Sequence, residues 1–188
     1  MADVFLMGTA GSGDDPQRSA WREPIKAACA QNGITCFDPV VSEWDDDAMR
    51  REVKALRTAR VIVMAITADT ASIASLAESG WVALSALQRK QAFGLYIDAK
   101  LSGKGVDARL TQESSTLINI LLGRGRARST AELVEASHRA RKLVGGHAQE
   151  LAVQFPELNL YVAPSLHDLT EWTVATARKL SQTPSQPG

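Results

Sequence analysis

The side chains in this sequence whose types and positions could do chemistry are carboxylates. Glu78 follows the apolar run 61–66 and a short polar turn, on a helix predicted to begin near Ser72. At about 100° per residue, Glu78 lies nearly opposite the apolar stripe expected to pack on a sheet, among small and aromatic neighbours. That stripe comprises Ile73, Leu76, Gly80, Ala83, Leu84 and Leu87. A carboxylate with so little other charge around it requires a structural or a chemical reason.

Two interpretations of Glu78 are open. Ser75 and Glu78 have the spacing of a capping box, in which the serine starts a helix and the glutamate accepts a hydrogen bond from the serine's backbone amide. The apolar pair that often accompanies such a box is absent, because Ala74 and Ser79 occupy its positions. Alternatively, the strand, turn and helix bring Glu78 to the carboxyl edge of the sheet, where open α/β folds bind ligands.

Further carboxylates follow other predicted strands. Asp38 closes the expected strand 34–37, which should deliver its side chain to the same carboxyl edge, and Asp69 lies in the polar turn after 61–66. Asp45 to Asp47 are explained by the start of a helix over about 46–58. The histidines and cysteines have no metal-ligand spacing, and no serine lies in a nucleophile elbow. We therefore expect carboxylate chemistry without a metal or cofactor.

A glycine-rich loop, Gly8 to Asp14, follows the first expected strand, 3–7. Glycines allow backbone amides to approach a phosphate or a sugar closely. The loop lacks the GK[ST] of a P-loop and the spacing of the dinucleotide fingerprint, so a flexible connection is the alternative. The basic turn 123–128 is expected to be a solvated surface loop.

Strands and helices alternate along the chain. Strands are expected at 3–7, 34–37, 61–66, 93–97 and 158–162. Helices are expected from Ser19 to about 32, over 46–58, 72–87 and 110–122, from about 130 to an interruption at Gly145-Gly146, over 147–154, and from Ser165. This alternation predicts the α/β class, with a flavodoxin-like open parallel five-stranded sheet and helices on both faces.

Composition narrows the class of protein. The 188 residues carry 21 basic and 21 acidic side chains, so no net charge favours nucleic acid or an anionic membrane as partner. No apolar run approaches the roughly 20 residues that span a bilayer, and the N-terminus lacks signal-peptide features. We expect a cytoplasmic protein with one domain, 1–181, and a disordered tail, 182–188. Cys29 and Cys36 are expected to be reduced packing residues.

Three stretches together resemble the nucleoside 2-deoxyribosyltransferase-like family. The first is Val4 to Gly8 with Trp21 shortly after. The second is Phe37 to Val41, followed by Trp44-Asp45 and a helix that bears Glu52. The third is the strand 61–66 with 72–80, which is similar to an S-x-x-x-L-x-E-x-G-like segment of the family. The resemblance covers roughly the first hundred residues, and the order and spacing of the stretches carry it.

The resemblance implies cleavage of the N-glycosidic bond of a nucleoside or nucleotide, or deoxyribosyl transfer. Glu78 would be the nucleophile that forms a covalent glycosyl-enzyme, and Asp38 or Asp69 would protonate the departing base. The residues implied to bind the substrate are Gly8, Thr9 and Gly11 of the loop, with Trp21, Trp44 or Trp81 stacking on it. The resemblance also implies a homo-oligomer, because family enzymes commonly complete their pockets with neighbouring subunits.

Alternative functions are a glycohydrolase acting on a larger nucleotide such as NAD, and a non-catalytic nucleotide sensor. A pyrophosphate would need basic donors, of which Arg18, Arg22 and the arginines of 124–128 are available. A further alternative is an interaction protein that uses the face around Ala74, Ser75 and Trp81. The surroundings of Glu78 distinguish these hypotheses, because a catalytic carboxylate should line an open cleft with a second carboxylate nearby.

Overall fold

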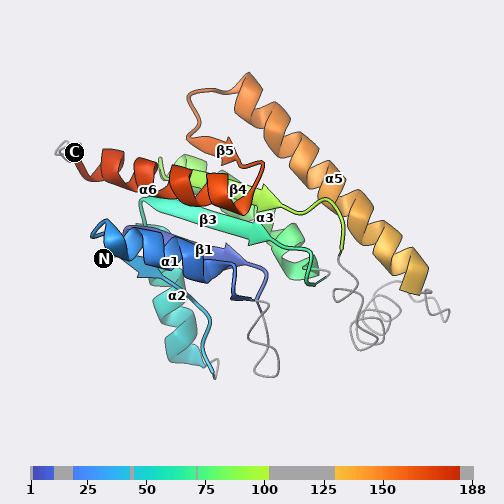
Figure 1. Ribbon diagram of the computed structural model, residues 1–188, viewed down its shortest axis with the longest axis horizontal. Coiled ribbons are helices and arrows are strands. Elements are labelled where there is room, and N and C mark those ends of the chain that lie inside the picture. Colours follow the sequence, from blue (N-terminus) through green and yellow to red (C-terminus); the bar gives the residue numbers. More distant parts are fainter. Residues whose placement is uncertain (1, 11–18, 43–44, 71, 102–129, 183–188) are drawn as a thin grey trace.

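Parallel strands lie side by side at the centre of the computed structural model, in the order β2-β1-β3-β4-β5 (Figure 1). The structure describes residues 2–10, 19–42, 45–70, 72–101 and 130–182. The strands are β1 Val4–Gly8, β2 Cys36–Phe37, β3 Val61–Ile66, β4 Ala92–Ile97 and β5 Leu160–Val162. The helices are α1 Arg22–Gln31, α2 Asp46–Thr58, α3 Ile73–Gln88, α5 Thr130–Gln154 and α6 Leu166–Gln182. The predicted α/β class and flavodoxin-like five-stranded sheet are confirmed.

The register of the sheet brings the carboxyl ends of its central strands to one edge. Gly8 pairs with Ala65, and Ala65 pairs in turn with Tyr96. The segments that leave β1, β3 and β4 therefore start next to one another. Ligands of open α/β sheets bind at such an edge.

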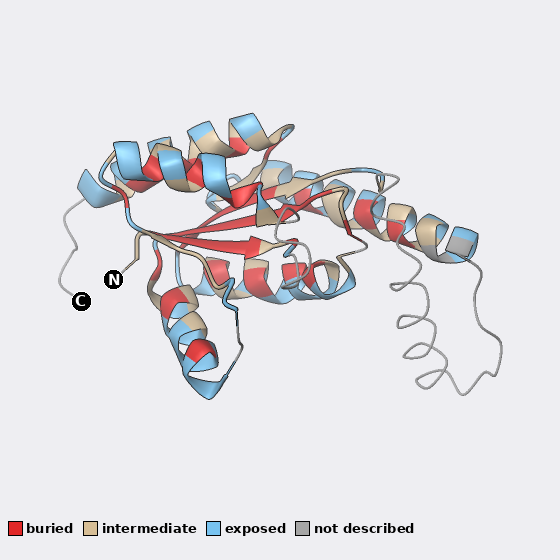
Figure 2. Ribbon diagram, turned by 60° about the horizontal axis from the view of Figure 1, so that its bottom comes forward, coloured by how far each residue is buried: buried red, intermediate tan, exposed pale blue. Residues whose placement is uncertain are grey.

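Helices cover both faces of the sheet. The core on one face joins β1 and β3 to α1 and α6 through residues such as Ile25 and Leu169. The core on the other face joins the same strands to α2, α3 and α5 through residues such as Ala55, Val82 and Ala148. Figure 2 shows the buried strands between these layers, with the outer surfaces of the helices exposed. All six residues of β3 are 0% exposed, as its unbroken apolar run predicts.

Close packing explains one glycine of the sheet. A side chain at Gly94 of β4 would collide with the indole ring of Trp172 on α6. That indole stacks on Tyr161 of β5, with ring centroids 5.3 Å apart. Glycine at position 94 therefore allows α6 to lie directly on the sheet.

Several predicted boundaries were wrong. α5 is one continuous helix through Gly145 and Gly146, where an interruption was expected. Glycine costs about 1 kcal/mol in a helix, and packing of α5 onto the rest of the fold outweighs that local cost. α1 begins at Arg22 with Trp21 at its N-cap position, so Ser19 is not its cap. The expected strands 34–37 and 158–162 are shorter in the structure.

The predictions for α2 and for the two cysteines can also be compared with the structure. α2 spans Asp46–Thr58, as expected, and Asp45 caps it by accepting a hydrogen bond from the Ala48 amide. Cys29 is buried and Cys36 partly buried, and both thiols are free. The predicted helix 110–122, the basic turn 123–128 and residues 183–188 of the expected tail 182–188 lie outside the described residues, whereas Gln182 is the last residue of α6. Among the described helices, none has the length and apolarity needed to cross a membrane.

Candidate functional site

Hydroxyl groups join the segments that follow β1 and β3 at the carboxyl edge. The Oγ1 atom of Thr9 lies 2.8 Å from Oγ of Ser72 and accepts a hydrogen bond of 2.9 Å from the Thr67 amide. Oγ of Ser72 also lies 2.8 Å from Oγ1 of Thr70. Thr9 is buried, and its bond with the Thr67 amide is shielded from water, whereas Ser72 is partly exposed. The network fixes the backbone immediately before α3.

Ser72 occupies a backbone conformation that side chains rarely adopt. It is the N-cap residue of α3 and has φ of 50° and ψ of 38°, in the left-handed region. Its hydroxyl makes no side-chain cap bond to the helix, because that group contacts Thr9 and Thr70 instead. A left-handed residue with a side chain costs roughly 1–2 kcal/mol, and such strain persists where surrounding contacts over-determine it.

The capping-box interpretation of Glu78 was wrong. α3 begins at Ile73, so Ser75 is its third residue and is buried against the core. A box would place Ser75 at the N-cap position, which Ser72 holds. Glu78 therefore has no capping role at the start of this helix.

The face of α3 that packs on the sheet also differs from the predicted stripe. The buried residues are small or medium-sized: Ser75, Ser79, Val82 and Ala86. Ile73, Trp81 and Leu84 point away from the sheet and are 51%, 77% and 52% exposed. The large side chains of β3 already fill the interior, so small residues let the helix approach them closely. Glu78 lies beside the packing face, one position before Ser79, instead of opposite it.

Glu78 is an exposed carboxylate with a shifted pKa. Partial burial raises the pKa of Glu78, and the negative charge of Glu52 on α2 raises it further. Among the described residues, Glu78 makes no hydrogen bond or salt bridge, and no contact joins it to Asp38 or Asp69. Glu52 is thus the neighbouring carboxylate that the structure supplies. The sequence predicts that Glu52 lies on the helix after Trp44-Asp45, but it assigns Glu52 no role.

Asp38 is held by two cations at the end of β2. Its carboxylate lies 3.3 Å from Nε of Arg22 and 3.4 Å from Nζ of Lys26. The Arg22 guanidinium is 1% exposed and donates to the backbone oxygens of Thr9, at 2.6 Å, and Gly8, at 3.5 Å. Burial lowers the pKa of Arg22 to about 10, against the opposite effect of Asp38, and the side chain stays charged at neutral pH. Arg22 is therefore engaged within the protein and is not a free donor for a pyrophosphate.

Asp69 and Asp98 lie in the segments that follow β3 and β4. Asp69 accepts a hydrogen bond of 3.1 Å from the Thr67 hydroxyl. Asp98 accepts from the Ala68 amide at 2.7 Å and from the Tyr96 hydroxyl at 2.5 Å. Burial and this bond to Asp98 raise the pKa of Tyr96. Asp98 thus ties the β3–α3 loop to β4, whereas Asp69 keeps one carboxylate oxygen without a hydrogen bond to the described residues.

Arg141 of α5 reaches the same edge from the opposite face to Arg22. It is 1% exposed and donates to the backbone oxygens of Ile66 and Asp98, at 3.3 and 3.0 Å. It also donates to those of Thr67 and Thr70, at 3.0 and 2.6 Å. Sequence reasoning missed this residue, because an arginine between Ala140 and Lys142 on a helix carries no local signal of burial.

The implied substrate-binding residues have different placements. Gly8 has φ of 119°, and a side chain there would collide with the Ala65 carbonyl of β3, which explains the glycine structurally. Trp21 is 7% exposed, and its indole donates to the Thr9 oxygen at 2.7 Å, so it packs in the core. Trp81 is exposed on α3. Gly11 and Trp44 lie outside the described residues.

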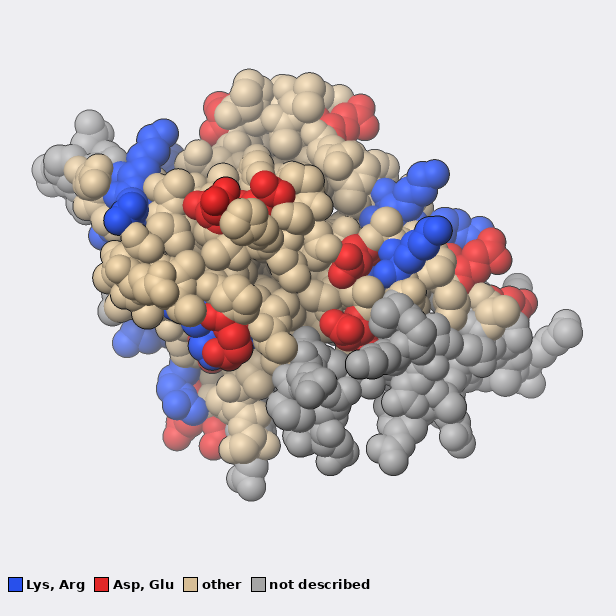
Figure 3. Space-filling view, viewed as in Figure 1, with Lys and Arg blue, Asp and Glu red and all other residues tan. Residues whose placement is uncertain are grey.

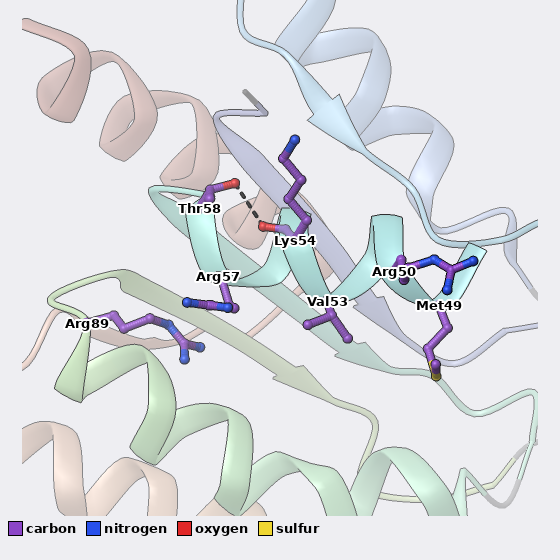
Figure 4. Close-up of a pocket in the computed structure, with 7 residues that line it drawn as sticks. All are labelled: Met49, Arg50, Val53, Lys54, Arg57, Thr58 and Arg89. Atoms are coloured by element: carbon purple, nitrogen blue, oxygen red, sulfur yellow. Dashed lines mark hydrogen bonds between the residues drawn. The ribbon is translucent and has the colours of Figure 1, made fainter. Parts of the chain in front are cut away.

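A groove of about 530 Å³ opens between α2 and the end of α3 (Figure 4). Met49 and Val53 point from α2 toward α3, and Arg89 enters from the end of α3. The remaining lining residues are Arg50, Lys54, Arg57 and Thr58. Glu78, Asp38 and Asp69 do not line it. Basic and acidic side chains are interspersed over the face in Figure 3, and no metal-binding cluster of His, Cys, Asp or Glu occurs in the described part of the chain.

The fold and the edge described above define an open α/β protein whose carboxyl edge is held by buried arginines and hydroxyl groups. A family model described as nucleoside 2-deoxyribosyltransferase like matches residues 1–94, half of the chain. The chain belongs to this family. The matched segment includes Thr9, Asp38, Asp69 and Glu78 but ends before Asp98 and Arg141. No curated protein matches the chain.

Proposed function

We propose that this protein cleaves the N-glycosidic bond of a nucleoside or nucleotide, with Glu78 as nucleophile. The observation that carries the proposal is the position of Glu78: it lies within the family-matched segment, on the helix that follows the central strand, without a structural partner among the described residues. A carboxylate that caps no helix and pairs with none of the described residues is available to attack an anomeric carbon.

The chemistry has two steps. The Glu78 carboxylate forms a bond to the anomeric carbon as the bond to the base breaks, giving a glycosyl-enzyme ester. Water or a second base then attacks the same carbon and releases the carboxylate, so hydrolysis and transfer share the intermediate. A raised pKa suits this role, because a more basic carboxylate is a stronger nucleophile once ionised.

The departing base must be protonated, and Asp69 is the favoured proton donor. Asp38 is the other candidate, but its two oxygens face Arg22 and Lys26. Asp69→Asn should therefore slow base release, whereas Asp38→Asn should act mainly by leaving Arg22 without its counter-ion. Comparison of the two variants, each with its unfolding free energy, distinguishes the roles. If only Asp38→Asn slows release while both variants stay equally stable, the assignment is reversed.

The substrate class favoured is a nucleoside or mononucleotide over a dinucleotide such as NAD. A pyrophosphate needs convergent cationic donors, and the hydrogen bonds of Arg22 to Gly8 and Thr9 withdraw that arginine from ligand binding. A substrate with at most one phosphate needs fewer cationic donors at the carboxyl edge of the sheet.

We also propose a homo-oligomer that covers the outer face of α3. Ile73, Trp81 and Leu84 form an exposed apolar surface on a helix whose small side chains face inward. This reversed pattern is typical of a helix with a second partner. Light scattering on the wild type and on Trp81→Ala should show a larger mass for the wild type. A wild-type mass of one chain would exclude this role.

The test of the main proposal is base release, followed by chromatography. The substrates are deoxynucleosides, ribonucleosides, their monophosphates and NAD, each with and without a second free base. Wild type is compared with Glu78→Gln and Glu78→Ala, and Glu52→Gln is the matched control because it removes the neighbouring carboxylate. Loss of release in both Glu78 variants, with retained folding and with activity in Glu52→Gln, supports the nucleophile. Binding without release from any substrate would instead indicate a nucleotide sensor.

A further inference from the structure

Arg141 is a buried arginine on α5, and its hydrogen-bond acceptors among the described residues are all uncharged. Nε of Arg141 donates to the Ser137 hydroxyl at 3.3 Å, and its terminal nitrogens donate to four backbone oxygens. Burial lowers the pKa of Arg141, and Asp98 opposes that effect. Burying a cation is costly unless hydrogen bonds replace its hydration. Its backbone acceptors lie at the ends of two strands and in one loop, so the guanidinium holds these segments together.

The acceptors of Arg141 define a clamp around the β3–α3 loop. Thr67 and Thr70 belong to that loop, while Ile66 is the last residue of β3 and Asp98 directly follows β4. The Asp98 carboxylate binds the Ala68 amide, so the loop is also held from β4. On its other side, Thr70 contacts Ser72, and Ser72 contacts Thr9 of the β1 segment. Arg141 is thus the point at which α5 is joined to the backbone that sets the start of α3.

We propose that Arg141 is a positioning residue: it fixes the β3–α3 loop and the strained Ser72, and through them the placement of Glu78 on α3. The activity consequence rests on the proposed function, whereas the clamp itself rests on the contacts of the free protein. Arg141 makes no hydrogen bond to the described residues of α3, so it acts on that helix through the loop. Arg141 lies beyond residue 94, so this positioning role belongs to the half of the chain that the family model does not match.

The geometry requires a guanidinium and not merely a positive charge. A planar fork with five donors serves Ser137 and four carbonyl groups at once, whereas a lysine ammonium has three donors at one point. Arg141→Lys should therefore keep the charge and lose part of the clamp. Arg141→Met keeps the length of the side chain and loses all of it. Arg139→Met is the matched control, because Arg139 is exposed on the same helix.

Hydrogen exchange of the free protein tests the clamp without any substrate. Exchange of the Thr67, Ala68 and Ser72 amides, which are hydrogen-bonded in the loop, should rise in Arg141→Met and to a smaller extent in Arg141→Lys. Amides of the β1–β3 ladder should keep their wild-type rates, as should all amides in Arg139→Met. Unchanged exchange of the loop amides in Arg141→Met would overturn the proposal and mean that Arg141 does not hold the loop. An equal rise in exchange throughout the sheet would also overturn it, because Arg141 would then stabilise the whole fold and not the loop in particular.

Activity and chemical rescue give the second test. In Arg141→Ala, kcat should fall about 100-fold with a smaller change in KM, because misplacement of the nucleophile affects the chemical step. Added guanidinium at low millimolar concentration should restore part of kcat, and tetramethylammonium at equal ionic strength should not. Failure of guanidinium to restore a folded variant would overturn the proposal. If the wild type releases no base, the proposed function fails, and the exchange experiment alone decides the clamp.

Discussion

Thr9 and Ser72 are 63 residues apart in sequence, and their hydroxyl oxygens lie 2.8 Å apart at the carboxyl edge of the sheet. The contact joins the segment after β1 to the N-cap of α3. Thr9 also accepts from the Thr67 amide, so one buried hydroxyl serves both ends of the β3–α3 loop. The placement of the helix that carries Glu78 therefore depends on a threonine from another strand.

Thr9→Val should destabilise the fold by about 1–3 kcal/mol, because it leaves the buried Thr67 amide without an acceptor. Valine matches the shape of threonine, so little packing is lost. Thr9→Ser is the control, since it keeps the hydroxyl. Chemical denaturation measures the unfolding free energy of all three proteins. A valine variant as stable as the wild type would mean that water or another group satisfies the amide.

The backbone strain at Ser72 can be separated from its hydrogen bonds. Ser72→Ala and Ser72→Gly both remove the hydroxyl, but only glycine adopts φ of 50° without steric cost. We expect Ser72→Gly to be about 1 kcal/mol more stable than Ser72→Ala by the same denaturation assay. Equal stability of the two variants would show that the left-handed conformation relaxes once the hydroxyl is gone.

The sequence predicted the fold well because its signals are local. The branched apolar run of β3 indicates a doubly covered strand by itself, and the aspartates at 45–47 mark the start of α2. The packing face of α3 was not predictable in that way. The apolar residues of α3 recur at helical spacing, yet its serines face the sheet. Which face packs depends on how much of the interior the side chains of the sheet occupy, and the sequence of the helix does not contain that information.

The site was only partly predictable for a related reason. Asp38 and Asp69 follow strands, so their placement at the carboxyl edge comes from topology. The clamp by Arg141 depends on α5 crossing the ends of β3 and β4, which are some 40 to 75 residues away in sequence. No periodicity of α5 distinguishes this arginine from its exposed neighbour Arg139.

Gly94→Ala should destabilise the protein by about 1–3 kcal/mol, because the new methyl group would collide with the Trp172 ring. Thermal or chemical unfolding provides the measurement. Gly146→Ala is the matched control: apart from the neighbouring backbone of α5, no described atom lies within 4 Å of a methyl group there, and alanine favours the helix. Adding Trp172→Phe to Gly94→Ala should recover part of the loss. Strict additivity of the two substitutions would contradict a direct collision.

Partial burial and the charge of Glu52 hold the pKa of Glu78 above its ordinary value. Glu52→Gln removes the second cause and should lower the Glu78 pKa, while burial keeps it above the ordinary value of about 4.3. An NMR titration of the side-chain carboxyl measures this shift directly. Glu157→Gln is the control, because that glutamate is exposed beyond the end of α5 and should leave the titration unchanged.

The raised pKa of Glu78 determines how the unfolding free energy and base release should change with pH. A carboxyl whose folded-state pKa is raised contributes stability that is present below its unfolded pKa and is lost as pH rises through the folded pKa. Relative to Glu78→Gln, the wild type should therefore lose unfolding free energy from about pH 4.3 upward, through the folded pKa. The nucleophile must be ionised, so base release should fall on the acid side of that pKa. In Glu52→Gln the acid limb should move to lower pH, and an unmoved limb would mean that a group other than Glu78 sets it.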